Sequence, residues 1–145
     1  FSPERTGGLP LQPFITLCYS GGYTEQEMRR LVMGNGGLLA YLGTSSAQEV
    51  EQRISAGDQR AREVYEAMAY QIAKEIGAYA VALKGKYEGI VLTGGMAKSA
   101  RLIDILREYI SILGELIVVP GEFEMEALAS WARRVINRQE IPKEY

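Results

Sequence analysis

Two adjacent glycines, Gly94 and Gly95, stand between a short apolar run and a helical pattern in residues 90–99, which read Ile-Val-Leu-Thr-Gly-Gly-Met-Ala-Lys-Ser. The uninterrupted, β-branched run predicts a strand buried on both faces, and α/β proteins bind ligands at the carboxyl ends of such strands. Because glycine has no Cβ atom, a flat ring or a phosphate can approach this backbone closely. The alternative is a tight turn that needs only a positive φ, and the residues alone leave both interpretations open.

Two common phosphate motifs are absent from this turn. No Gly-Lys-Ser/Thr follows at the spacing of a Walker loop, and the third glycine of the dinucleotide-binding fingerprint is missing. We therefore predict contact with the base or ribose of a nucleotide.

Charged residues near the two ends of the chain are further candidates. Arg5 lies in a polar, glycine-rich segment, where a planar guanidinium can clamp a phosphate or carboxylate, although most loop arginines are simply solvated. Glu122, Glu124 and Glu126 begin the last predicted helix. Carboxylates at this position either stabilise the helix N-terminus or bind Mg²⁺.

Composition excludes several classes of function. The 145 residues are 47% hydrophobic and 23% charged, which fits one globular domain. A net charge of −2 argues against nucleic acid or membrane partners. The chain has no histidine, so its chemistry depends on carboxylates, Arg, Lys, hydroxyls or backbone. A single cysteine, Cys18, and the absence of a signal peptide predict the cytoplasm.

The elements that position these residues follow from hydrophobic periodicity and capping signals. Helices are predicted over residues 11–20, 24–33, 46–57, 58–85, 98–113 and 123–138, and strands over 89–92 and 116–119. Residues 38–42 are too short for periodicity to separate strand from helix. The order predicts an α/β fold whose βαβα core has a parallel strand pair and an incomplete sheet.

Finer expectations concern single residues. Thr24 with Glu27, and Ser46 with Glu49, fit reciprocal capping boxes, and Asp58 is predicted to cap the long helix. Gly77, inside that helix, predicts close approach of another backbone. The aromatic residues of the same helix are expected in the core or in helix contacts; they are Tyr65, Tyr70 and Tyr79.

Several segments together closely resemble the butyrate kinases, over nearly the whole chain. They are residues 1–7 (Phe-Ser-Pro-Glu-Arg-Thr-Gly), 34–44, 64–77, 92–97 (Leu-Thr-Gly-Gly-Met-Ala) and 120–122 before 127–129. Butyrate kinases group with acetate kinases in the superfamily of sugar kinases, heat-shock chaperones and actin, which have two ribonuclease-H-like domains. The resemblance implies transfer of the γ-phosphoryl group of ATP, with Mg²⁺, to the carboxylate of butyrate, giving an acyl phosphate.

The resemblance also implies roles for particular residues. Arg5 matches the arginine that stabilises the transferring phosphoryl group, and Glu124 matches the acidic residue that helps hold Mg²⁺, although Glu122 and Glu126 leave its register open. The nucleotide-binding set is Gly94, Gly95, Met96, Ser99, Ser46, Ala47 and Gln48. This chain departs from the family pattern at Ser99, where acetate kinases have Asn, and at Ser46 and Gln48, where relatives usually have Asp and Arg.

The resemblance places residues 1–145 in the C-terminal part of the second, nucleotide-side domain, with the N-terminal domain and the phosphate loops upstream of Phe1. We therefore expect the piece alone to be inactive. A sheet that is short of strands exposes its edges and apolar surface, so we also expect a homo-oligomer. Acetate, propionate or a branched acid is an alternative substrate. A catalytically silent nucleotide-binding or oligomerisation module is the alternative from another class.

Overall fold

The computed structural model describes residues 1–141, apart from the side chain of Glu124. Its helices are α1 (Leu11–Cys18), α2 (Glu25–Val32), α3 (Gly37–Leu42), α4 (Ala47–Ser55), α5 (Gln59–Ala82), α6 (Ala100–Ile110) and α7 (Glu124–Ile136). Its strands are β1 (Ile90–Gly94) and β2 (Leu116–Pro120), and η1 (Gly95–Lys98) and η2 (Ser111–Leu113) are short 3-10 turns. The predicted α/β class is confirmed.

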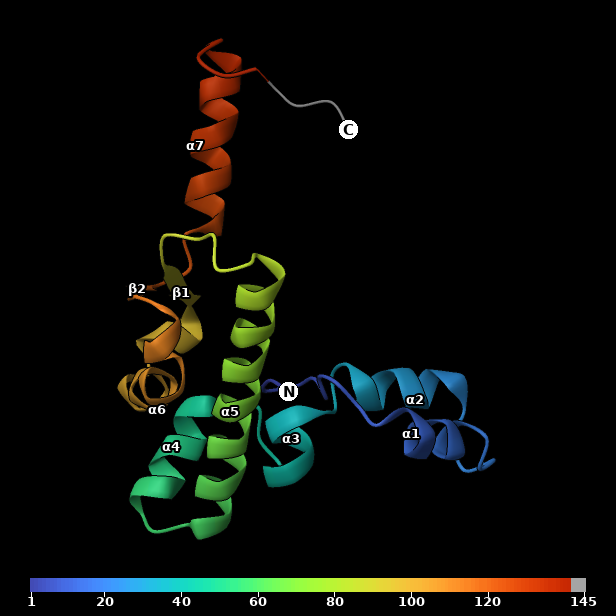
Figure 1. The fold of residues 1–145 in the computed structure, drawn as a ribbon. Helices are drawn as coiled ribbons and strands as arrows, with labels where there is room; N and C mark the ends of the chain where they lie inside the picture. Colours follow the sequence, from blue (N-terminus) through green and yellow to red (C-terminus); the bar gives the residue numbers. More distant parts are fainter. Residues whose placement is uncertain (142–145) are drawn as a thin grey trace.

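Helix α5 is the centre of the fold, with α3, α4 and α6 packed against it (Figure 1). Its buried side chains recur at helical spacing and face α4 and α6, where Leu102, Leu106 and Ile110 complete the core. Val64 and Met68 of this helix are buried, whereas Leu83, its C-cap, is 53% exposed. The buried α5 residues are Ala61, Val64, Tyr65, Met68, Ala69 and Ala73.

Two expectations about α5 are wrong. A Cβ atom on Gly77 would meet nothing within 4 Å in the described chain, so no backbone packs closely against this glycine. Tyr79 is 68% exposed and does not belong to the core. Tyr65 is fully buried, and Tyr70 packs against Tyr109 of α6 in a tilted arrangement with 5.5 Å between ring centroids. Ala73 is the last buried residue of α5, so helical spacing in the turns that follow it does not report burial.

The two strands form the parallel pair that the sequence predicts, with Ile90 opposite Leu116 and Gly94 opposite Pro120. The expectation that both strand faces are buried is wrong, because burial alternates along β1 and Val91 is 61% exposed. Ile90, Leu92 and Leu116 pack against the core. Helices of the described chain cover one face of the sheet, which leaves alternate side chains on the other face open.

Local hydrogen bonds set the starts of α2 and α4. The capping box of α2 forms as predicted, since the Thr24 side chain accepts from Glu27 N and the Glu27 carboxylate accepts from Thr24 N. Only half of the second box forms: Ser46 Oγ accepts from Glu49 N, but the Glu49 carboxylate accepts from the Thr44 hydroxyl instead of Ser46 N. Thr44 therefore competes for the carboxylate that the pattern assigned to Ser46.

Residues 38–42, which periodicity left open, form helix α3. The segment before Gly7 lies across the start of this helix, where Leu38 N donates to Ser2 O and Leu39 N donates to Pro3 O. Arg5 and Met33 form an isolated antiparallel bridge on the same segment. The first residues of the chain thus satisfy backbone donors that a helix N-terminus leaves free.

Helices α1 and α7 contribute no buried side chain among the described residues. Figure 1 shows α7 extending away from the α5–α6 core, and α1 with α2 on the opposite side of α5 from α6. Large apolar side chains of α7 are exposed, among them Met125 at 78% and Ile136 at 79%.

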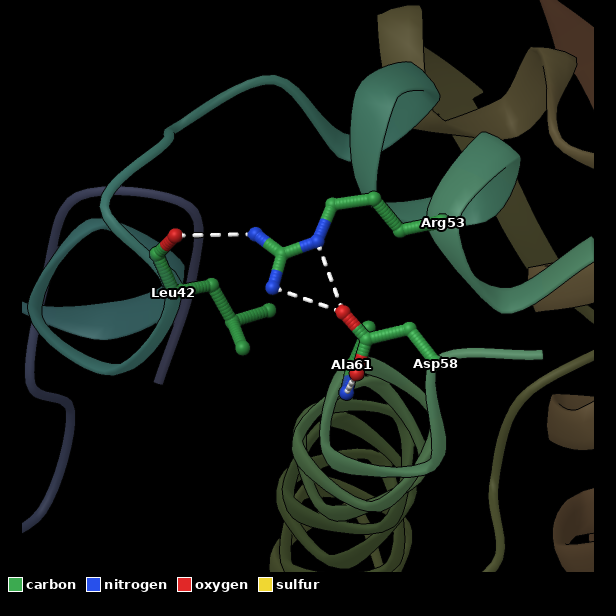
Figure 2. Close-up of polar contacts among 4 residues, drawn as sticks. All are labelled: Leu42, Arg53, Asp58 and Ala61. Atoms are coloured by element: carbon green, nitrogen blue, oxygen red, sulfur yellow. Dashed lines mark hydrogen bonds and ion pairs between the residues drawn. The ribbon is translucent and has the colours of Figure 1, made fainter. Parts of the chain in front are cut away.

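Arg53 joins α3, α4 and α5 through polar contacts (Figure 2). Its guanidinium donates to Leu42 O at 2.9 Å and pairs with Asp58 at 2.7 Å. Asp58 accepts from Ala61 N through its other oxygen and so caps α5, as the sequence predicts. These contacts of Arg53 with Leu42 and Asp58, called the latch below, hold α4 against α3 and α5. The first turn of α4 borders the candidate site.

Candidate functional site

A cavity of about 410 Å³ lies where the first turns of α4 meet η1 and the start of α6. Its size is typical of small-molecule sites, which measure roughly 300–1,000 Å³. Elements far apart in the sequence contribute to its walls, because α4 and α6 both pack against α5. The lining residues are Ala47, Gln48, Glu51, Tyr65, Gly95, Met96, Lys98 and Ser99.

Five of the seven residues predicted to bind nucleotide line this cavity: Ala47, Gln48, Gly95, Met96 and Ser99. The other two adjoin it, since Ser46 caps α4 and Gly94 ends β1. Packing of both α4 and α6 against α5 thus brings two segments separated by almost 50 residues to the same cavity.

The glycine turn owes its shape to Gly94. Its φ of 84° with ψ of −172° is a conformation essentially limited to glycine. Gly94 N donates to Gly121 O at 3.0 Å, which ties the turn to the end of β2. Gly95 then starts η1, and an added Cβ atom there would stand 3.4 Å from a Glu122 carboxylate oxygen. The turn therefore combines a backbone conformation that requires glycine, at Gly94, with a wall of the cavity, at Gly95.

Three polar side chains at the floor of the cavity form a hydrogen-bonded cluster. Oε1 of Glu51 accepts from the Tyr65 hydroxyl and from Ser99 Oγ, each at 2.5 Å. Ser99 also caps α6 by accepting from Leu102 N at 2.9 Å. The predicted helix start at Lys98 is therefore wrong by two residues. The cluster connects α4, α5 and α6 at the point where they border the cavity.

Burial raises the pKa of Tyr65 above its usual range, and the hydrogen bond to Glu51 raises it further. The Tyr65 hydroxyl consequently stays protonated and donates to the carboxylate. Because both partners of Glu51 Oε1 are donors, the cluster suits an ionised carboxylate, which can only accept.

Sequence reasoning missed Glu51, Tyr65 and Lys98 as lining residues. Glu51 follows Ala47 by four positions, so a helix starting at Ser46 places both on one face, and this was the available signal. Tyr65 is part of the apolar stripe of α5 and was assigned to the core alone. Lys98, exposed in η1, brings a cation to the cavity wall.

Arg5 does not line the cavity. Its side chain is exposed, while its backbone is held by the bridge to Met33 and by hydrogen bonds with Ser2. The structure therefore holds the segment that carries Arg5 against α3 but does not join its guanidinium to the predicted nucleotide residues.

The acidic candidates follow β2. Glu122 lies beside Gly95, as described above, and the side chain of Glu124 lies outside the described part of the structure. Among the side chains that are described, no three Asp, Glu or Cys residues form a group that would hold a metal ion. The register among Glu122, Glu124 and Glu126 remains a prediction.

Two curated relatives are similar in sequence to the whole of this chain. A probable butyrate kinase 2 of Caldanaerobacter subterraneus subsp. tengcongensis is 52% identical over the whole chain, and a probable butyrate kinase of Listeria monocytogenes serotype 4a is 47% identical. The chain spans 41% of the length of each.

Solved structures show the same fold. The crystal structure of Porphyromonas gingivalis acetate kinase matches with a TM-score of 0.80 and 22% identity, over 92% of this chain and 40% of that one. Acetate kinase from Entamoeba histolytica matches with a TM-score of 0.81 and 14% identity, over 94% of this chain and 42% of that one.

In the described residues no helix is long and apolar enough to cross a membrane. The family model of the acetokinases matches residues 5–140, almost the entire chain. Together with relatives about half identical over their aligned length, this match shows that the chain belongs to the acetokinase family.

Proposed function

We propose that this chain is the C-terminal part of the second, nucleotide-side domain of a kinase that transfers the γ-phosphoryl group of ATP to butyrate, giving butanoyl phosphate. The observation that carries the proposal is the 410 Å³ cavity, which gathers five residues predicted to contact nucleotide. The names of the butyrate kinase relatives support the choice of acid. Because the chain spans 41% of those relatives, we assign the remaining phosphate contacts to other parts of a longer kinase.

In this proposal the cavity takes the nucleoside part of ATP. Ala47, Met96 and the bare backbone of Gly95 offer flat, weakly polar surface for a base. Lys98 and Gln48 bring polar groups to the same walls. Binding here fixes where the triphosphate leaves the cavity, and positioning is a large part of phosphoryl-transfer catalysis.

Arg5 is proposed to act on the phosphoryl group. The support is the resemblance of residues 1–7 to the butyrate kinases, because Arg5 does not line the cavity. A guanidinium held by an anchored backbone can stabilise charge that develops on the equatorial oxygens of the transferring group.

Mg²⁺ is proposed to lie near the carboxylates that follow β2, with Glu124 as its protein contact. Mg²⁺ keeps several waters and takes one or two protein carboxylates, so a single Glu is enough. The ion would neutralise phosphate charge when bound. Mg²⁺ titration of Glu122→Gln, Glu124→Gln and Glu126→Gln identifies the contact, because only the true ligand's variant should need more Mg²⁺.

The test uses a complete kinase that contains this chain, supplied with ATP and a panel of acetate, propionate, butyrate and branched acids. We expect acyl phosphate with kcat/KM highest for butyrate. Arg5→Ala should lower kcat by about 10² to 10⁴ with a smaller change in the KM for ATP. Arg30→Ala, an exposed arginine of α2, is the matched control. ATP binding without turnover of any acid would indicate a nucleotide-binding module instead, and another preferred acid would correct the substrate.

A further inference from the structure

Glu51 has one carboxylate oxygen occupied and the other free. Oε1 accepts from Tyr65 and Ser99, whereas no donor among the described residues is paired with Oε2. The described side chains include no buried oxygen or nitrogen without a partner, so Oε2 is accessible. Because Glu51 lines the cavity, its free oxygen is an acceptor available to a ligand there.

The cluster also fixes the direction of this acceptor. Two short hydrogen bonds hold Oε1 toward α5 and α6, and Ser99 is itself held by its cap on α6. The carboxylate therefore needs little reordering when a ligand binds, which favours a strong hydrogen bond. Hydrogen bonds from a hydroxyl to a carboxylate are among the stronger ones in proteins.

We propose that Glu51 is a specificity-determining residue whose Oε2 accepts a hydrogen bond from a ribose hydroxyl of the bound nucleotide. The inference rests on the proposed nucleotide site. A sugar is the expected neighbour because Glu51, Tyr65 and Ser99 make one polar patch, while Ala47 and Met96 offer the less polar surface that suits a base. With Oε1 already satisfied, Oε2 is the oxygen left to accept from a ribose hydroxyl, 2′ or 3′.

The experiment compares the binding of ATP, 2′-deoxy-ATP and 3′-deoxy-ATP by the complete kinase, before and after Glu51→Gln. In the original protein one deoxy analogue should bind about tenfold more weakly than ATP, which is the effect expected for a hydrogen bond to a charged group. Glu51→Gln should weaken ATP binding by a similar factor and remove the preference, because a neutral amide then faces the hydroxyl. Its affinity for the discriminated analogue should change less than twofold.

Tyr65→Phe is the matched control, since it removes a partner of Oε1 and leaves Oε2 in place. It should lower thermal stability but keep the preference for ATP over the deoxy analogue. If the Tyr65→Phe and Glu51→Gln variants lose the preference equally, the cluster acts by shaping the cavity and the assignment is wrong.

The outcomes separate the two proposals. If the original protein does not bind ATP, the proposed function fails and this inference fails with it. If it binds ATP but accepts both deoxy analogues equally well, only the inference fails, and this holds even if Glu51→Gln does not fold. A Glu51-dependent preference for ATP over an analogue that lacks the 6-amino group, without any for the hydroxyls, would assign Glu51 to the base and overturn the ribose contact.

Discussion

The carbonyl oxygen of Ser2 lies 1.7 Å from the position that a Cβ atom on Gly37 would occupy. Gly37 also has a φ of 60°, so its backbone and its surroundings both require glycine. Leu38 N donates to the same carbonyl, which means that the contact holds the first segment of the chain against the start of α3.

Gly37→Ala should therefore cost far more than strain at a positive φ. Gly43→Ala is the matched control, because Gly43 has a φ of 75° and open space around its Cβ position. The control should lower the free energy of unfolding by about 1–2 kcal/mol, the usual penalty for an L residue in the left-handed region. Gly37→Ala should lose about 2 kcal/mol more, since the segment before Gly7 must move and its hydrogen bonds break. Chemical denaturation measures both, and equal losses would contradict the close contact.

How far the sequence determines these features depends on the range of the interactions. Capping of α2 and α5 is predictable because Thr24 with Glu27, and Asp58 with Ala61, are three residues apart. Even contacts this local are not fully predictable. At Ser46 only half of the capping box forms, because the Glu49 carboxylate accepts from the neighbouring Thr44 hydroxyl.

Burial and contacts that depend on residues far apart in the sequence could not be predicted from local patterns. Periodicity reports which face of an element is apolar but not whether another element covers it, so the exposure of Val91 and Tyr79 was not predictable. The Glu51–Ser99 contact spans 48 residues and requires α4 and α6 to pack on α5. Five cavity residues were nevertheless predicted: the strand–turn–helix pattern indicated Gly95, and family resemblance supplied the other four.

Removing the Arg53 side chain should loosen the junction of α3, α4 and α5. Arg53→Ala deletes a charged donor to Leu42 O, a bond of a kind that contributes about 1.5–3 kcal/mol. Partial exposure of Arg53 reduces this to an expected loss near 1 kcal/mol. Arg29→Ala removes an exposed i,i+4 pair with Glu25 and should change stability negligibly. Urea unfolding of both variants tests the contrast, and equal effects would mean that the latch adds nothing beyond a surface pair.

Stability should fall in acid because of Asp58. The amide of Ala61 and then the Arg53 guanidinium lower the pKa of the Asp58 carboxyl. A lowered pKa in the folded state contributes stability at neutral pH, and protonation removes it as the pH falls below the ordinary value of about 4. Asp58→Asn should lower stability at pH 7 and flatten the curve between pH 5 and 2 (about the window of carboxylate protonation). Asp104→Asn, at an exposed position, is the control. If stability falls with pH in the same way in the original protein and in Asp58→Asn, this carboxylate does not cause the loss of stability in acid.

The glycine turn allows backbone strain to be separated from ligand contact. Gly95 lines the cavity and has no positive φ, so Gly95→Val adds bulk at the wall while the backbone remains allowed. In a complete kinase we expect nucleotide affinity to fall at least about tenfold, the cost of losing roughly 1.4 kcal/mol of binding, with little change in melting temperature.

Gly94→Ala should show the opposite pattern. At φ 84° and ψ −172° an alanine is strained, and its Cβ atom would point into open space, so stability should fall by about 1–3 kcal/mol. The nucleotide affinity of the folded fraction should change less than in Gly95→Val. Nucleotide titration measures the affinity of both variants, and thermal melting measures their stability. If Gly95→Val lowers stability and affinity together, or leaves affinity unchanged, the turn is a structural feature and the cavity wall does not face the nucleotide.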